Sequence, residues 1–174
     1  MHRLTGLLKD HPVRLSKTAI HLWQLPLLQA TAENLFLWPL LSVDEQERAK
    51  RFVRRQDQEK FVRARGFVRL LLGHYLSLPP AEVVFEYGLR GKPQLAVATR
   101  ATGLQFNLSH CQDLAIVAIA PRYSLGVDLE QLNPQVSYPQ TLVVRFFRLG
   151  GWMSFYAVYP EADLRSDVFQ ALDA

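Results

Sequence analysis

The chain has 174 residues, of which 49% are hydrophobic and 21% charged, and its net charge is +4. This composition fits one domain or a compact pair of half-domains and excludes a disordered chain. The single cysteine, Cys111, excludes an intrachain disulfide, so a reducing, cytoplasmic compartment is expected. Charged residues and Pro12 interrupt the apolar stretches near the N-terminus, so we expect no membrane span there.

The first elements expected along the chain are a strand and a capped helix. Residues 19–27 alternate enough between apolar and polar side chains to predict a strand. Ser42 and Glu45 have the spacing of a capping box, and acidic residues fill the first turn that follows. A helix is therefore predicted from Ser42 to about Val53.

A second helix and several short strands are expected next. The polar run 54–60 is expected to turn the chain, and an apolar stripe predicts a helix over about residues 59–75. Beyond Glu130 the pattern weakens, since residues 141–147 suit a helix or a strand and residues 150–174 have no clear period. Apolar runs bounded by turn residues predict strands over 83–88, 104–110, 113–120 and 125–130. The expected fold class is α+β, with a helical pair and a mostly antiparallel sheet.

The basic residues are concentrated in the predicted helices. Nine of the chain's 20 Lys and Arg residues lie between Arg48 and Arg69. Such a cluster can bind nucleic acid, a polyphosphate or an acidic partner protein. On composition alone, a solvated helix face is the favoured interpretation.

Two carboxylates occupy alternate positions of the strand predicted over 125–130. Side chains two apart on a strand leave the same face, so Asp128 and Glu130 have Cα atoms roughly 6.5 Å apart on one side. Such a pair repels unless a cation lies between the two groups, and Mg²⁺ prefers oxygen ligands. Taken alone, the pair is more often solvated surface than a metal site.

Two further patterns also have ordinary structural explanations. Gly91, Lys92 and Pro93 predict a tight turn that holds a cation in place. His110 follows Ser109 at the end of a predicted strand, where it could equally be a core histidine bonded to backbone.

Read in chain order, these patterns form a series. It runs E-Q-E-R-A-K-R-F (45–52), F-V-R-A-R-G-F-V-R (61–69), G-K-P (91–93), F-N-L-S-H (106–110) and G-V-D-L-E (126–130). Over about residues 19–130 the series resembles the Sfp-type 4′-phosphopantetheinyl transferases. The resemblance implies an enzyme that moves the phosphopantetheine arm of coenzyme A onto a serine of an acyl, peptidyl or polyketide carrier protein. Mg²⁺ would be required, and adenosine 3′,5′-bisphosphate would be released.

The resemblance also implies a fold and a set of site residues. The fold is a pseudo-twofold pair of α+β half-domains, with residues 1–125 as the N-terminal half and 126–174 as the start of the second. Asp128 and Glu130 match the metal ligands, and together with His110 they are the expected catalytic residues. The positions that match coenzyme A contacts are Arg48, Lys60, Arg65, Lys92, Pro93, Ser109, His110 and Asp128.

One part of the family pattern has no match. The W-x-x-K-E-A helix of the second half is missing, so a shortened second half is expected. Two alternatives follow, namely an inactive remnant and a module that binds coenzyme A or a nucleotide without transfer. A nucleic-acid binder is disfavoured because the ordered Ser-His and Asp-x-Glu pairs have no role in it, and no membrane partner is expected.

Overall fold

Two compact units make up the computed structural model of the chain. The helical unit comprises the described residues of 27–85, and the sheet unit comprises those of 15–26 and 86–159. Residues 31–33, 124–125, 130–131 and those from 145 onward are described by their backbone alone. The structure describes Leu15 and residues 20–28, 31–88, 91–97, 102–121, 124–131, 145–149 and 152–159.

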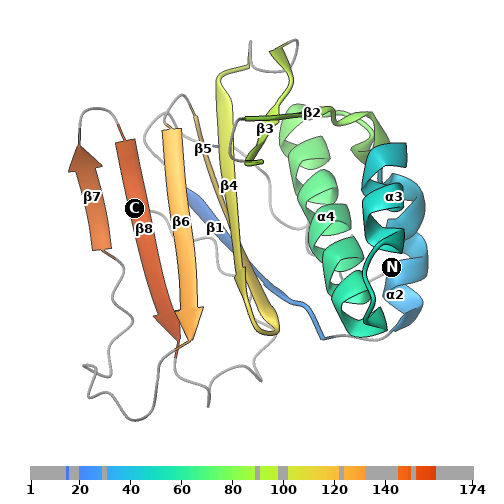
Figure 1. Cartoon of the computed structure of the whole chain (residues 1–174). Helices are drawn as coiled ribbons and strands as arrows, with labels where there is room; N and C mark the ends of the chain where they lie inside the picture. The colour runs from blue at the N-terminus through green and yellow to red at the C-terminus, as the bar shows by residue number, and fades with distance from the viewer. Residues whose placement is uncertain are drawn as a thin grey trace. The chain divides into compact units, whose positions relative to one another are not determined.

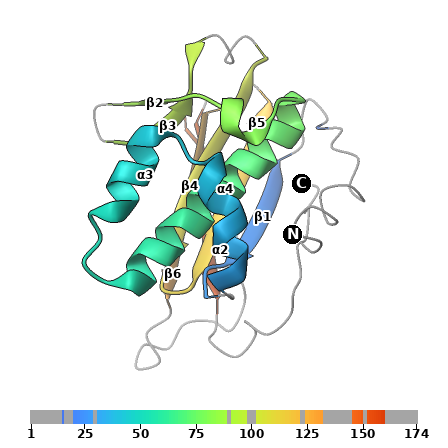
Figure 2. The ribbon, with the colours of Figure 1, turned by 90° about the vertical axis from the view of Figure 1, so that its right-hand side faces the viewer.

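Three α-helices form the helical unit. The long α4 (Arg55–Leu76) contacts both α2 (Thr31–Leu37) and α3 (Val43–Lys50), as Figure 2 shows. Two single 3₁₀ turns complete it, η1 (Trp38–Leu40) after α2 and η2 (Pro80–Glu82) after α4. The prediction of a helical pair is thus confirmed, with α2 as an additional short helix.

The start of α3 is as predicted and its end is not. Ser42 is the N-cap, and its backbone N–H donates to Glu45 Oε2 at 3.1 Å, so the capping box is confirmed. The helix ends at Lys50, and Val53 is 100% exposed. The predicted extension to Val53 is wrong because apolar spacing alone cannot show which side chains find a packing partner.

The start of α4 corrects a second prediction. The run 54–60 was expected to turn the chain, yet helix begins at Arg55. The Nε atom of Arg55 donates to Glu59 Oε1 at 2.8 Å, and this i,i+4 ion pair favours helix in a run without apolar residues. At the other end Ser77 adopts φ 54°, and the helix closes with a bond from Leu78 N–H to Gly73 O at 2.8 Å.

Close helix packing inside the helical unit depends on one glycine. Gly66 of α4 faces Leu37 of α2, and a Cβ atom at Gly66 would lie 2.7 Å from Leu37 Cβ. Around this contact Leu37, Leu41, Ala49 and Val62 form a buried apolar cluster. A larger residue at position 66 would therefore push the two helices apart.

Strands in three groups form the sheet unit (Figure 1). One antiparallel sheet has the order β1-β5-β4, and a second sheet has the order β6-β8-β7, in which β6 and β8 are parallel. The strands β2 and β3 form a separate pair. The strand bounds are His21–Pro26 (β1), Phe85–Tyr87 (β2), Pro93–Leu95 (β3), Leu104–Cys111 (β4), Leu114–Pro121 (β5), Ser124–Gln131 (β6), Arg145–Leu149 (β7) and Trp152–Tyr159 (β8).

Most of these strands were predicted. The α+β class and the strands β1, β2, β4, β5 and β6 are confirmed. The run 141–147, open between helix and strand, contains the start of β7, and β8 lies where no period was recognised. The predicted half-domain boundary between residues 125 and 126 falls within β6 and stays a prediction.

The core of the sheet unit decides which way β6 faces. Every residue of β5 from Leu114 to Ala120 is buried, as expected of a wholly apolar central strand. Val127 and Leu129 of β6 pack into the same cluster as Ile116 and Ala118. Alternation then directs Asp128, between them, out of this core, and Asp128 is exposed.

In the part of the chain that the structure describes, no helix is long and apolar enough to cross a membrane.

Candidate functional site

Two of the predicted site residues meet between neighbouring strands of the sheet unit. Ser109 lies on β4 and Asp128 on β6, and the hydroxyl of Ser109 donates to Asp128 Oδ1 at 3.1 Å. The backbone N–H of Leu129 donates to the same carboxylate oxygen at 3.0 Å. One oxygen of Asp128 is thus held by two donors.

The same strands are joined by two further bonds. The N–H of Val127 donates to Asn107 Oδ1, and the N–H of Leu129 donates to Ser109 Oγ, both at 3.1 Å. Asn107 is 8% exposed and Ser109 is half-buried. These bonds connect β4 with β6, which contact each other and belong to separate backbone ladders.

The carboxylate of Asp128 is suited to a hard cation. Its Oδ2 atom has no hydrogen-bond partner among the described residues, and the side chain is exposed. Carboxylate oxygens are the ligands that Mg²⁺ takes in proteins. Glu130 lies two residues along β6, opposite Val158 of β8, and its side chain lies outside the described part. Among the described residues, no three side chains of His, Cys, Asp or Glu lie together as potential metal ligands.

The end of β4 carries the remaining part of the Ser-His step. His110 is exposed and pairs with Ala115 of β5, one position after Ser109. Successive residues of a strand point to opposite faces, so the two side chains leave β4 on different sides. Cys111 packs partly buried against the apolar cluster of the sheet unit, as expected for a small core residue.

The predicted turn at Lys92 joins β2 to β3. Gly91 has φ +71°, a conformation that glycine adopts without strain, and Gly88 N–H donates to the carbonyl of Lys92 at 3.1 Å. Pro93 is the first residue of β3, where its missing N–H costs no bond. Lys92 is half-buried, and burial lowers the pKa of its amine from the ordinary 10.5.

Two of the predicted basic residues of the helical unit meet around one aromatic ring. The guanidinium carbons of Arg48 and Arg65 lie 5.3 Å and 5.7 Å from the ring centroid of Phe61 on α4. Arg48 is exposed, whereas Arg65 is 6% exposed and its Nε lies 3.8 Å from Glu45 Oε1. The third predicted residue, Lys60, is half-buried on α4.

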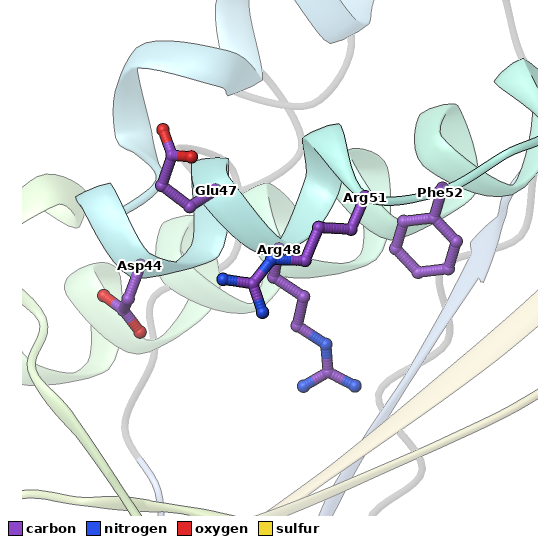
Figure 3. A pocket seen from close by; sticks show the side chains of 5 residues that line it. All are labelled: Asp44, Glu47, Arg48, Arg51 and Phe52. Atoms are coloured by element: carbon purple, nitrogen blue, oxygen red, sulfur yellow. The ribbon is translucent and has the colours of Figure 1, made fainter.

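An open hollow of about 730 Å³ borders Arg48. Its described lining comes from α3 and the two residues after it (Figure 3). Asp44, Arg48 and Arg51 are spaced i, i+4 and i+7 and share one side of the helix, while Phe52 closes one end. The carboxylates of Asp44 and Glu47 also line this hollow, so its described lining carries both signs of charge.

Three arginines of α4 lie in the interior of the helical unit and not on a solvated face. Arg63, Arg65 and Arg69 are all buried. Arg69 Nε donates to Glu45 Oε2 at 2.7 Å, and another of its guanidinium nitrogens donates to the carbonyl of Val83 at 2.6 Å. These arginines therefore serve the interior of the helical unit, which composition alone did not indicate.

Comparison with known proteins decides the family. A family model described as the N-terminal part of 4′-phosphopantetheinyl transferase matches residues 29–122. The chain belongs to the 4′-phosphopantetheinyl transferase family. The matched segment contains Arg48, Lys60, Arg65, the turn at Lys92 and the Ser109-His110 step.

Individual relatives agree with this assignment. The 4′-phosphopantetheinyl transferase HetI of Nostoc sp. is 41% identical over 143 residues, which are 82% of this chain and 60% of the relative. A putative 4′-phosphopantetheinyl transferase of Synechocystis sp. is 34% identical, over 62% of this chain and 43% of the relative. The human L-aminoadipate-semialdehyde dehydrogenase-phosphopantetheinyl transferase is 29% identical, over 59% and 34%. The chain thus spans roughly one third to three fifths of these curated relatives.

Membership in the 4′-phosphopantetheinyl transferase family confirms the resemblance and the α+β fold that it implied. The individual site residues remain predictions, and the structure adds three that sequence reasoning missed. Asn107 lay inside the quoted F-N-L-S-H pattern but was not named as a site residue. Arg51 and Phe61 lay inside the quoted motifs, and their helical spacing from Arg48 or Arg65 could have identified them.

Proposed function

We propose that this chain transfers the 4′-phosphopantetheine arm of coenzyme A to a serine of a carrier protein in a Mg²⁺-dependent reaction. The observation that supports this most directly is the carboxylate of Asp128, which is exposed and oriented by two donors in a chain of this family. The carrier is an acyl, peptidyl or polyketide carrier protein of the cytoplasm.

The reaction is a phosphoryl transfer. The serine oxygen of the carrier bonds to the phosphorus that bears the pantetheine arm, and the phosphoanhydride bond to the adenosine side breaks. The electron pair of that bond leaves with adenosine 3′,5′-bisphosphate, and the serine proton is released. Catalysis of this kind depends on positioning and on electrostatic stabilisation.

Each proposed residue has a task in that chemistry. Asp128 and Glu130 would hold Mg²⁺, which stabilises charge on the pyrophosphate as the bond breaks. His110 is proposed as a catalytic residue that contacts the phosphates. The exposed guanidinium of Arg48 and the amine of Lys92 can pair with the phosphates of coenzyme A through charge-assisted hydrogen bonds.

The remaining proposed contacts differ in how well their surroundings suit a ligand. Pro93 shapes the turn that carries Lys92, and Lys60 is half-buried. Arg65 is the proposed contact least suited to meet a ligand from solvent, because it is buried beside Glu45. We expect Arg65 to act mainly by supporting Phe61, behind the exposed Arg48.

The test is a modification assay. The chain is incubated with an apo carrier protein, coenzyme A and Mg²⁺, and mass spectrometry measures the gain of the arm on the carrier. Asp128→Asn should reduce the rate on the order of 100-fold, the scale for losing one electrostatic group at a reacting centre. Glu82→Gln, which removes an exposed carboxylate from η2, is the control and should keep the wild-type rate.

Two results would contradict the proposal. An unmodified carrier together with retained coenzyme A binding would favour the binding-module alternative. Transfer that proceeds equally well in Asp128→Asn would remove Asp128 from the site.

A further inference from the structure

The feature that carries a further inference is the connection between β4 and β6. β4 is the edge strand of the sheet β1-β5-β4, and β6 is the edge strand of the sheet β6-β8-β7. Two side chains of β4 accept the N–H groups of β6 that point toward it, Asn107 from Val127 and Ser109 from Leu129. We call this pair the Asn107–Ser109 clamp.

The two bonds of the clamp form a repeating pattern. In each, a β4 residue meets the β6 residue twenty positions later, and the two pairs are themselves two residues apart. Two equal offsets specify one register, with β4 and β6 running in the same direction. A slip of one residue would turn Val127 and Leu129 out of the core and Asp128 into it.

The bonding of Ser109 determines what its hydroxyl can do. The Leu129 N–H can only donate, so Ser109 Oγ must accept from it, and the hydroxyl proton is directed at Asp128 Oδ1. A phosphate ester is an acceptor, and the single proton of Ser109 cannot serve both it and Asp128. Direct phosphate binding by Ser109 would therefore cost the bond to Asp128.

We propose that Asn107 and Ser109 are positioning residues for the transferase reaction, and that Ser109 acts through Asp128 rather than on the phosphates directly. The clamp fixes the register of β6, and the Ser109 hydroxyl orients Asp128 so that Oδ2 is directed to a cation. This inference rests on the proposed function insofar as it makes Asp128 a metal ligand. Partners that orient a metal ligand commonly change metal affinity by 10–100-fold.

The first measurement tests the ligand role without transfer. Mn²⁺ binding to the whole chain is followed by electron paramagnetic resonance in the absence of coenzyme A. Ser109→Ala should weaken Mn²⁺ binding about 10-fold or more, and Ser109→Thr, which keeps the hydroxyl on a strand-favouring side chain, should restore it. Equal Mn²⁺ affinity in Ser109→Ala and wild type would overturn the proposal.

The second measurement separates the two possible roles of Ser109. Coenzyme A binding is measured by calorimetry with chelator present, so that no divalent cation contributes. If Ser109 acts through Asp128, Ser109→Ala should bind coenzyme A as wild type does under these conditions. A loss of affinity in chelator would show direct phosphate contact and overturn the indirect role.

The third measurement tests the clamp independently of any function. Amide hydrogen exchange should become faster at Val127 in Asn107→Leu, because that variant removes the acceptor of the Val127 N–H. Exchange should also become faster at Leu129 in Ser109→Ala, where the Leu129 N–H loses one of its two acceptors and keeps Asp128 Oδ1. Asn107→Asp retains an acceptor oxygen and should protect Val127. If Ser109→Ala fails to fold, Ser109→Cys offers a side chain of similar size with a weak donor and tests the same bonds.

These outcomes keep the two proposals apart. Faster exchange at Leu129 in a chain that binds no Mn²⁺ would support the clamp and overturn the metal site of the proposed function. Unchanged exchange at both amides would overturn the clamp, whatever the transfer assay shows.

Discussion

The ion pair between α3 and α4 offers the sharpest test of what holds the helical unit together. Glu45 is 1% exposed and Arg69 is 2% exposed, and their closest atoms are 2.7 Å apart. Glu45 also accepts the Ser42 N–H at the helix cap. The change Glu45→Gln keeps an oxygen for the cap and removes the negative charge, so that Arg65 and Arg69 face no buried anion.

The expected cost follows from this burial. Removing one partner of a buried, hydrogen-bonded pair typically destabilises a protein by about 3–5 kcal/mol. For a chain of this length that corresponds to a decrease in Tm of roughly 6–20 °C. That loss is a large share of the roughly 5–15 kcal/mol by which whole proteins are typically stable.

The assay is urea denaturation followed by far-UV circular dichroism, which reports mainly on the helices. Glu47→Gln is the matched control, because Glu47 lies on the same helix and its pair with Lys50 is exposed and 2.7 Å long. Exposed pairs contribute about 0–1 kcal/mol, so the control should differ little from wild type. The double variant Glu45→Gln with Arg69→Met should recover part of the loss, since it removes both charges of the pair. If Glu45→Gln costs no more than Glu47→Gln, the reasoning about the buried pair is refuted.

Three further predictions concern single contacts. Gly66→Ala should lower the free energy of unfolding by about 1–3 kcal/mol, because its Cβ would lie 2.7 Å from Leu37 Cβ, and an unchanged urea midpoint would count against this packing. Hydrogen bonding to Lys50 lowers the pKa of Glu47, so Lys50→Met should raise that pKa toward the ordinary 4.5 in an NMR titration, and a constant value would contradict the contact. Burial lowers the pKa of Lys92, so in the pH window just below 10.5 the amine takes up a proton on unfolding, and the free energy of unfolding should rise with pH there. Lys92→Met should abolish that rise, as measured by denaturation at several pH values. A rise that persists in Lys92→Met would point to another group.

Local signals in the sequence predicted most of the helices and strands. The capping box at Ser42 located the start of α3, and the apolar run of β5 indicated a buried central strand. The predictions failed where a long-range partner decides the outcome. Val53 has helical spacing but lies beyond the end of α3, and β8 pairs with β6 across more than twenty residues of chain.

The candidate site was predictable to a similar degree. Ser109 and Asp128 were expected together, and the structure brings them into hydrogen-bond contact. Asn107 lay inside the F-N-L-S-H pattern, but its role was missed because its partner is the backbone N–H of Val127 on another strand. The pairing of Glu45 with Arg69 was likewise invisible, since two charges 24 residues apart have no preferred relation before the helices pack.

The Asn107–Ser109 clamp also has a mechanical consequence for the sheet unit. Along β5, eight consecutive residues of β4 are matched by a continuous backbone ladder, so shear between those strands must break many bonds at once. Between β4 and β6, three hydrogen bonds involve the side chains of Asn107 or Ser109, and the two strands share no backbone ladder. Under mechanical force or on heating, β4 and β6 should therefore separate before β4 and β5 do. That separation would occur directly beside the carboxylate of Asp128.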